Sequence, residues 1–269
     1  MNYAAMTAQE LGRGAKLTVH KRGDAGEVFY ELALIMLDTI RKNNAEGKNT
    51  VMIVPVGPTG QYPIFVRLAN GEKLPLDRCW FINMDEYLDD NGQWLDIAHP
   101  LSFRGYMDRE VYGKLDAPPP RAQRIFPDPN APERVQEIID QAGGVDLCVG
   151  GVGINGHLAF NEPQPELTVQ QFGALTTRVL DIAPETRTAN AIGALHGAVD
   201  HMPRRCVTIG MRQILAAKKI RLACFRDWHR YVVRRAAYGD EQSSFPVTLL
   251  QSHPDAALII TENCAAMPQ

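Results

Sequence analysis

Short, mostly apolar runs alternate with segments of helical periodicity along most of the chain, and this alternation constrains the fold more than any other feature. Runs with the length and composition of buried strands occupy residues 51–56, 79–84, 145–149, 206–209, 220–225 and 257–261. Helices are expected over residues 23–42, 63–68, 103–112, 132–141, 211–218 and 229–238. Strands that are apolar on both faces form mostly parallel sheets covered by helices on both sides. The sequence therefore predicts a three-layer α/β/α fold, in which helices cover both faces of a mostly parallel, Rossmann-like sheet.

Composition and charge narrow the class of protein. The 269 residues contain no repeat, low-complexity tract or linker-like shift, so residues 1–269 are expected to form a single domain. With 28 basic against 31 acidic residues, the net charge is −3, and the chain lacks the basic field that would hold nucleic acid. The five cysteines are scattered and form no Cys-x-x-Cys pair or Cys/His cluster with zinc spacing, so no metal is expected.

The chain is also not expected to have a membrane partner. Its longest apolar run is far shorter than the roughly 20 residues that span a bilayer. The first 22 residues lack the apolar core of a signal peptide. Together with the scattered, unpaired cysteines, these observations favour a soluble, cytoplasmic protein with reduced thiols.

Three of the expected strands run into polar or glycine-rich loops, and ligands bind beyond the carboxyl ends of the strands in open parallel sheets. The loop at residues 57–60 precedes a helix, so it is either an anion site or a simple turn with a threonine cap. The pair Asp85-Glu86 directly follows an apolar strand. A carboxylate there suits general base catalysis, and the alternative is negative charge at a helix N-terminus.

The third loop carries the strongest signal. Four glycines within residues 150–156 indicate close backbone approach or positive φ. Their spacing also matches a dinucleotide fingerprint, but no first βαβ unit frames it. His157 follows at once, between Asn155 and Glu162. An imidazole needs a partner to fix its tautomer, so this grouping favours a catalytic histidine over a structural one.

The segments at 83–87 and 150–163 together resemble the glucosamine-6-phosphate deaminase/isomerase family. Further similar segments at 99–103, 186–190, 207–210 and 249–254 extend the resemblance over about residues 25–265. The 6-phosphogluconolactonases share the fold, but their motifs usually read Asp-Glu-Arg and Thr-Ala-Ser-Leu-Phe. Here the corresponding segments read Asp-Glu-Tyr and Leu-Ala-Phe-Asn-Glu-Pro. A lactone hydrolase that uses His157 as its base, or a catalytically silent sugar-binding module, are the alternative functions.

The resemblance implies an aldose–ketose isomerase that deaminates an amino sugar, a hexosamine 6-phosphate in the family, to a ketose phosphate and ammonia without any cofactor. His157 would open the pyranose ring, oriented by Asn155 and Glu162, and Asp85 would move the C2 proton to C1. A homo-oligomer is a further implication. The expected contacts to the sugar or sugar phosphate are Thr59, Gly60, Gln61, Glu86, Gly156 and Arg187.

The departures from the family fall on the group that holds phosphate. The family loop resembles Pro-Thr-Gly-Gly-Thr-Pro, whereas Gln61 and Tyr62 replace a glycine and a threonine here. A family arginine aligns with Ile192, and a family lysine aligns near His229. Phosphate without basic partners binds weakly, so an unphosphorylated or different amino sugar is the alternative substrate. The arginines that would compensate are Arg187, Arg226 and Arg230.

Overall fold

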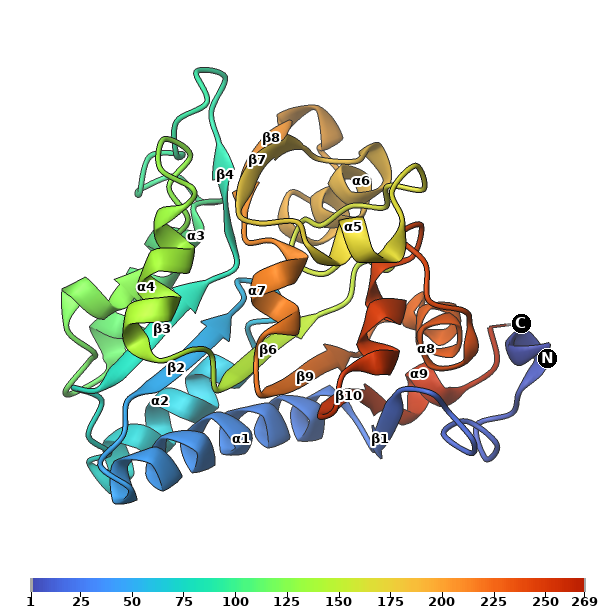
Figure 1. Ribbon diagram of the computed structural model, residues 1–269, viewed down its shortest axis with the longest axis horizontal. Helices are drawn as coiled ribbons and strands as arrows, with labels where there is room; N and C mark the ends of the chain where they lie inside the picture. Colours follow the sequence, from blue (N-terminus) through green and yellow to red (C-terminus); the bar gives the residue numbers. More distant parts are fainter. Residues whose placement is uncertain (1, 269) are drawn as a thin grey trace.

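The computed structural model describes residues 2–268, whose centre is a seven-stranded parallel sheet of order β1-β10-β9-β6-β2-β3-β5 (Figure 1). Its strands are β1 (Thr18–Arg22), β2 (Thr50–Val54), β3 (Cys79–Asn83), β5 (Arg124–Ile125), β6 (Leu147–Gly151), β9 (Lys219–Cys224) and β10 (Ala256–Thr261). Every pairing in this sheet is parallel. The predicted three-layer α/β/α class is confirmed, although β1 and β5 were not expected from the sequence.

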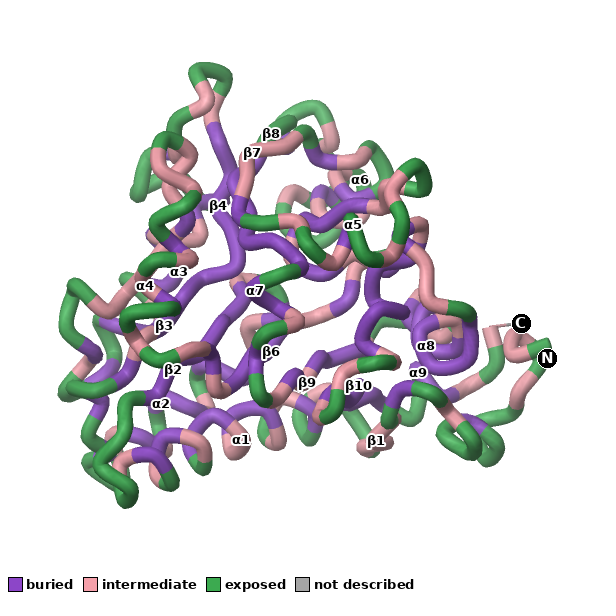
Figure 2. Tube along the Cα trace, viewed as in Figure 1, coloured by how far each residue is buried: buried purple, intermediate pink, exposed green. Residues whose placement is uncertain are grey.

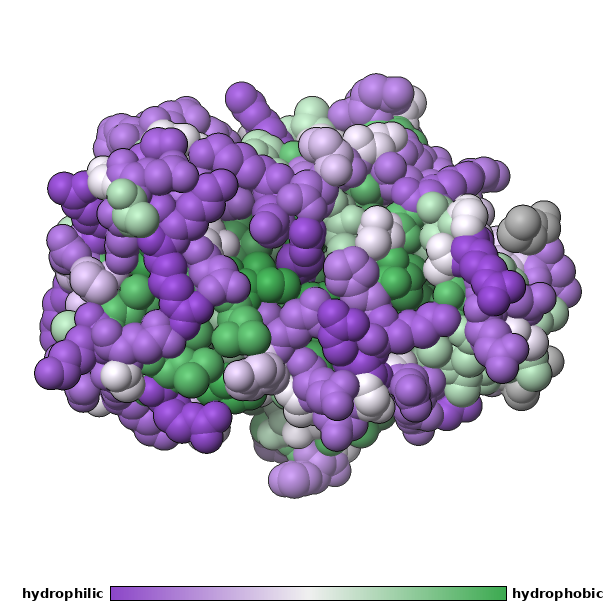
Figure 3. Space-filling model, turned by 90° about the horizontal axis from the view of Figure 1, so that it is seen from below, coloured by the Kyte–Doolittle hydropathy of each residue, from purple (hydrophilic) through white to green (hydrophobic). Residues whose placement is uncertain are grey.

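Strand side chains alternate between two apolar layers, one on each face of the main sheet. Figure 2 shows that most residues of the central strands are buried. In β2, Met52 and Val54 belong to the layer shared with α1 (Ala25–Ala45) and α2 (Gln61–Glu72). Val51 and Ile53 belong to the opposite layer. That layer is shared with α4 (Arg134–Ala142), α7 (Met211–Leu215), α8 (His229–Tyr238) and η5 (Pro246–Ser252). Seen from beneath, the outer surface is mostly hydrophilic with smaller apolar patches (Figure 3), as expected of a helical layer that turns its polar side to solvent.

The sheet has a topological switch point between β2 and β6. From β2 the chain builds β3 and β5 on one side, and then returns to place β6 on the other side of β2. The loops that leave β2 and β6 meet here, because a Cβ added to Gly151 would lie 3.0 Å from Cδ of Pro58. Such a switch point opens a crevice at the carboxyl ends of the strands, where α/β proteins bind ligands.

A second, antiparallel sheet stands above those carboxyl ends (Figure 1). Its strands, in the order β4-β8-β7, are β4 (Asp85–Leu88), β8 (Arg205–Thr208) and β7 (Arg178–Asp181). It packs in a core of its own, which includes Tyr87, Phe160 and Ala191. The helical segments around the two sheets are α3 (Phe103–Glu110), α5 (Val169–Gly173), α6 (Pro184–Ala194), α9 (Glu262–Ala265), η1 (Tyr3–Ala5), η2 (Tyr112–Lys114), η3 (Arg121–Gln123) and η4 (Val199–His201).

This second sheet corrects two expectations. Residues 206–209 were assigned to the parallel sheet but form β8, which pairs antiparallel with β4. Asp85-Glu86 was expected to end a strand or to lie at a helix N-terminus, and instead begins β4. Both differences have one cause: Asp85 pairs with Thr208, and local periodicity does not encode a partner so distant in the chain.

Residues 2–268 contain neither a helix fit to span a membrane nor a cluster of side chains fit to bind a metal ion. No helix in this range is both long and apolar enough to cross a bilayer. In the same range, no group of three or more His, Cys, Asp or Glu side chains is placed to hold a metal ion.

Candidate active site

A cleft of about 400 Å³ lies at the switch point, between the main sheet and the antiparallel sheet. All three polar loops singled out in the sequence contribute to its wall, through residues 57–59, 84–85, 151–154 and 157. The remaining wall comes from segments that are distant in sequence, including α6 and the turn before α8. The polar and charged side chains on the wall are those of Thr59, Asp85, Tyr87, Ser102, Tyr106, His157, Thr186, Asn190, Arg226, Trp228 and His229.

The alternation of β4 separates the roles of its two acids. Asp85 lines the cleft, whereas Glu86 is directed to the start of α3 and is not part of the cleft wall. The Glu86 carboxylate accepts hydrogen bonds from the backbone N–H of Phe103 (3.0 Å) and Arg104 (2.8 Å) and from the hydroxyl of Ser102 (3.1 Å). Negative charge is favourable at a helix N-terminus. Glu86 therefore stabilises α3, and the structure does not bring it to the cleft wall, where a substrate contact was predicted.

Asp85 sits in an environment that disfavours its charge. Burial, and then the neighbouring charge of Glu86, raise the pKa of Asp85 well above its usual range. Asp85 nevertheless lines the cleft, and the residue keeps 7% of its surface exposed. A carboxylate of raised pKa is a stronger base than a solvated one, as is needed to abstract a proton from carbon.

A hydrogen-bond chain fixes the tautomer of His157. The amide nitrogen of Asn155 donates to Glu162 (2.8 Å) and to Glu185 (3.1 Å). Ionised carboxylates only accept, so this contact places the amide oxygen of Asn155 toward Nδ1 of His157, 2.8 Å away. Nδ1 then carries the hydrogen and donates it to Asn155. In the neutral ring this tautomer leaves Nε2 as the free acceptor nitrogen, on a ring that lines the cleft.

Glu162 supports this arrangement with a permanent negative charge. One of its oxygens lies 3.4 Å from Nδ1 of His157 and accepts a hydrogen bond from the hydroxyl of Thr186 (3.1 Å). Burial raises the pKa of Glu162, but the contacts with His157, Asn155 and Thr186 outweigh it and leave the pKa lowered. Thr186 was missed as a site residue. The only sequence signal was its place in the family-like segment at 186–190.

The glycine spacing of the histidine loop is explained by local packing. A Cβ on Gly153 would lie 2.0 Å from Cε1 of His157, so the imidazole rests directly on this backbone. Gly156 has φ +81°, and its N–H closes a turn onto the carbonyl of Gly153. A Cβ on Gly156 would lie 2.8 Å from the ring of Phe245. Gly156, predicted to contact substrate, thus shapes the loop and is absent from the cleft wall.

The loop after β2 presents residues 57–59 to the cleft, but not Gly60 or Gln61. A Cβ on Gly60 would lie 2.2 Å from the ring of Phe29, so this backbone packs against α1. Gln61 is fully buried, and its amide donates to the carbonyl of Pro58 (2.8 Å). Gly60 and Gln61 therefore support the loop from beneath, in place of the substrate contacts predicted for them.

Of the three arginines considered as phosphate ligands, Arg226 alone lines the cleft. Arg187, predicted to contact substrate, donates instead to the carbonyls of Val199 (3.2 Å) and Met202 (2.9 Å). Arg230 contacts the side chain of Asn263. Arg226 is also the one lysine or arginine among the described residues of the cleft wall.

The two positions aligned with family cations carry no charge toward the cleft. Ile192 is 65% exposed on α6 and is not part of the cleft wall. His229 lines the cleft, but its Nδ1 accepts from the backbone N–H of Phe225 (3.1 Å) and Arg226 (2.9 Å). Its Nε2 donates to the carbonyl of Val152 (2.9 Å). Burial lowers the pKa of His229 to about 4, so the ring is neutral at pH 7.

Replacing His229 with lysine is therefore expected to destabilise the protein and not to create a phosphate ligand. His229→Lys removes these hydrogen bonds and places a charge in a buried site, at a cost of roughly 3–5 kcal/mol. Denaturant unfolding of His229→Lys measures this cost, with the exposed substitution Ile192→Lys as the matched control. Equal stability of the two variants would contradict the structural role of His229.

The curated proteins that are similar to this chain include several glucosamine-6-phosphate deaminases. No family model matches the chain. Over 249 residues it is 28% identical to glucosamine-6-phosphate deaminase 1 of Bacillus subtilis, covering 90% of this chain and 95% of that protein. Over 216 residues it is 31% identical to the glucosamine-6-phosphate deaminase of Rhodopirellula baltica, covering 78% of this chain and 80% of that protein.

Solved structures agree with this assignment. A monomeric glucosamine-6-phosphate deaminase superposes with a TM-score of 0.80 at 27% identity, covering 92% of this chain and 98% of that one. The 6-phosphogluconolactonase of Leishmania guyanensis superposes with a TM-score of 0.67 at 15% identity, covering 92% and 97%. The second likeness, at such low identity, shows the shared fold alone.

Proposed function

This chain belongs to the glucosamine-6-phosphate deaminase family, and we propose that it converts an amino sugar into a ketose and ammonia by proton transfer from C2 to C1. One observation carries the proposal: Asp85, with its raised pKa, and His157, whose Nδ1 is held by Asn155, line the same cleft. These two groups are what an aldose–ketose isomerisation needs: one moves a proton between the C1 hydroxyl and the ring oxygen, and the other moves a proton between C2 and C1.

The reaction begins with ring opening. His157 takes the proton of the C1 hydroxyl through Nε2 and returns it to the ring oxygen, which breaks the bond between C1 and that oxygen. The imidazolium formed in between is stabilised by Asn155 and by the charge of Glu162.

Asp85 then acts on the open chain. Its carboxylate removes the C2 proton while the aldehyde oxygen O1 takes up the proton that the C2 ammonium group releases, giving a neutral enol with the amino group still on C2. Asp85 then returns its proton to C1 as the nitrogen lone pair forms the C=N bond. The product is an iminium at C2, and water adds to it and expels the nitrogen as ammonium, leaving the ketose. The Asp85 carboxylate is regenerated, so this sequence consumes no acid or base.

The principal experiment measures ammonia release from a panel of hexosamines and their 6-phosphates. Turnover of at least one member is expected. Folded protein that binds a sugar without releasing ammonia would support the sugar-binding module. Acid formation from sugar lactones, unaffected by Asp85→Asn, would support the lactone hydrolase, in which Asp85 has no role.

We further propose that Arg226 binds the substrate phosphate. It lies on the cleft wall next to α6, since a Cβ on Gly193 would lie 3.6 Å from one of its guanidinium nitrogens. Arg226→Gln is expected to raise KM for a hexosamine 6-phosphate by roughly 10- to 100-fold, the value of one charge-assisted contact. KM for the unphosphorylated sugar should stay unchanged.

The matched control is Arg230→Gln, because the guanidinium of Arg230 contacts Asn263 outside the cleft. Equal effects of Arg226→Gln on both sugars would remove Arg226 from phosphate binding. The homo-oligomer and the cytoplasmic location implied by the family resemblance stay predictions, and the relative with a TM-score of 0.80 is described as monomeric.

A further inference from the structure

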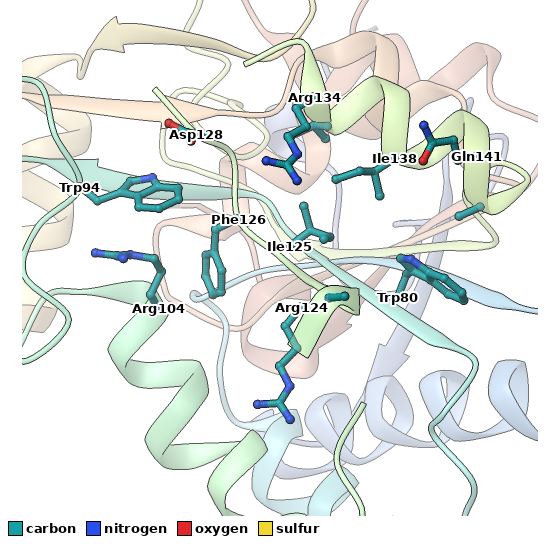
Figure 4. A pocket seen from close by; sticks show the side chains of 13 residues that line it. Trp80, Trp94, Arg104, Arg124, Ile125, Phe126, Asp128, Arg134, Ile138 and Gln141 are labelled. Carbon is teal, nitrogen blue, oxygen red and sulfur yellow. The ribbon is translucent and has the colours of Figure 1, made fainter. Parts of the chain in front are cut away.

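A second cavity, of about 580 Å³, lies at the edge of the main sheet where β5 ends it (Figure 4). It shares no lining residue with the candidate active site. Its apolar wall is formed by Trp80 of β3, Ile125 of β5, Phe126 directly after β5, and Ile138 of α4. We call it the edge cavity.

Basic side chains surround this apolar wall. Arg134 reaches from α4 toward Ile125 and Phe126 (Figure 4), and it forms no ion pair within the described residues. The guanidinium of Arg104 lies 4.4 Å from the ring centre of Trp94, which also lines the cavity. Arg124 is the third basic residue, and Asp128 carries the one carboxylate among the described residues that line the cavity.

We propose that the edge cavity binds a small molecule that combines an anionic group with a flat apolar body. The anion would lie at Arg134, because this guanidinium has no competing carboxylate partner. The apolar body would pack on Phe126 and the two tryptophans, as aromatic ligands do in pockets of mixed polarity. A simple inorganic anion would leave the apolar wall uncovered, and a neutral aromatic would leave Arg134 without its partner.

The edge cavity is connected to the active site through Arg104. The backbone N–H of Arg104 donates to Glu86 (2.8 Å), and its Nε lies 3.5 Å from the same carboxylate oxygen. Glu86 directly follows Asp85 in β4. Leu95, next to Trp94, donates to the backbone carbonyl of Tyr87 (3.1 Å), which is also in β4. A ligand that shifts Arg104 or Trp94 therefore acts on the strand that carries the base.

Binding can be measured without any activity. Trp228 lies in the active-site cleft, so in Trp228→Phe the two remaining tryptophans both line the edge cavity. The probe is 8-anilinonaphthalene-1-sulfonate, an aromatic sulfonate that accepts energy from tryptophan. Its neutral parent, N-phenyl-1-naphthylamine, tests the apolar part alone, and inorganic sulfate tests the anion alone. Energy transfer should show that the sulfonate binds saturably with a stoichiometry of one to one. Its affinity should be about tenfold or more above that of the neutral parent.

Two variants locate the probe. Arg134→Ala should weaken the sulfonate about tenfold and leave the neutral parent unchanged, since only the charge contact is lost. Ile138→Glu should weaken the binding of both probes, because it places a charge in the apolar wall. Binding that neither variant alters, or that glucosamine 6-phosphate displaces competitively, would overturn the proposal.

The effect on catalysis rests on the proposed function and is tested separately. With the wild-type enzyme, saturating sulfonate is expected to change kcat or KM for ammonia release several-fold, as coupled sites typically do. Arg134→Ala should shift that effect to higher probe concentration. Binding with unchanged kinetics would overturn the coupling through Arg104. A protein without deaminase activity would contradict the proposed function and leave the fluorescence result standing.

Discussion

Asp85→Asn is expected to lower kcat by roughly 10²–10⁴ while leaving the fold and sugar binding intact. Asparagine has nearly the same shape as aspartate and can fill its place on the cleft wall, but it cannot accept the C2 proton. Ammonia release by the purified variant measures the loss, and calorimetric binding of the same sugar shows that the site is preserved. A decrease of less than about tenfold would exclude Asp85 as the base.

The raised pKa of Asp85 sets the pH dependence of the wild-type enzyme. The base works only when ionised, so kcat/KM should fall with decreasing pH well above the ordinary carboxyl range of roughly 4. The pKa of Asp85 is raised first by burial and then by the charge of Glu86. Glu86→Gln removes the second cause and should move the acid limb to lower pH, although α3 loses a stabilising charge.

The same pKa makes Asp85 a cost to stability at neutral pH. Because the folded state disfavours the ionised carboxyl, stability is lost as pH rises from the unfolded-state pKa, roughly 4, through the raised folded-state pKa. Asp85→Asn should therefore unfold at a higher temperature than the wild type at pH 7 to 8. The difference should vanish below about pH 4, where both side chains are neutral.

The sequence was informative where structure is local. The apolar runs that form β2, β3 and β6 predicted the parallel sheet, and the loops after them predicted the position of the cleft. The antiparallel sheet was not predicted, because the pairing of Asp85 with Thr208 joins distant segments. Knowing β4 as a strand would have placed Asp85 and Glu86 on opposite faces from alternation alone.

The site residues divide in the same way. Asn155, His157 and Glu162 lie within one short loop, so their proximity could be inferred from the sequence. Arg187 and Arg226 could not be told apart, because their roles depend on what each side chain meets after folding. Arg187 meets backbone carbonyls, whereas Arg226 lines the cleft.

His157→Gln is the second large effect expected, a decrease in kcat/KM of roughly 10²–10⁴ for a pyranose substrate. Glutamine can keep a hydrogen bond to Asn155, but its amide is not a base at any pH of interest. Ammonia release measures the loss, and unfolding by denaturant shows whether the loop is preserved. Activity within tenfold of the wild type would mean that ring opening does not need His157.

Substitutions of Asn155 test whether the tautomer matters, since Asn155 does not need to touch the sugar. Asn155→Asp keeps an acceptor for Nδ1–H of His157 but adds a third carboxylate beside Glu162 and Glu185. Because the acceptor is kept, Asn155→Asp should hold the same tautomer of His157 and retain most of the activity. Asn155→Leu removes the acceptor and frees the wrong tautomer, so its activity should be lost. Equal activity of the two variants would show that Asn155 does not orient the base.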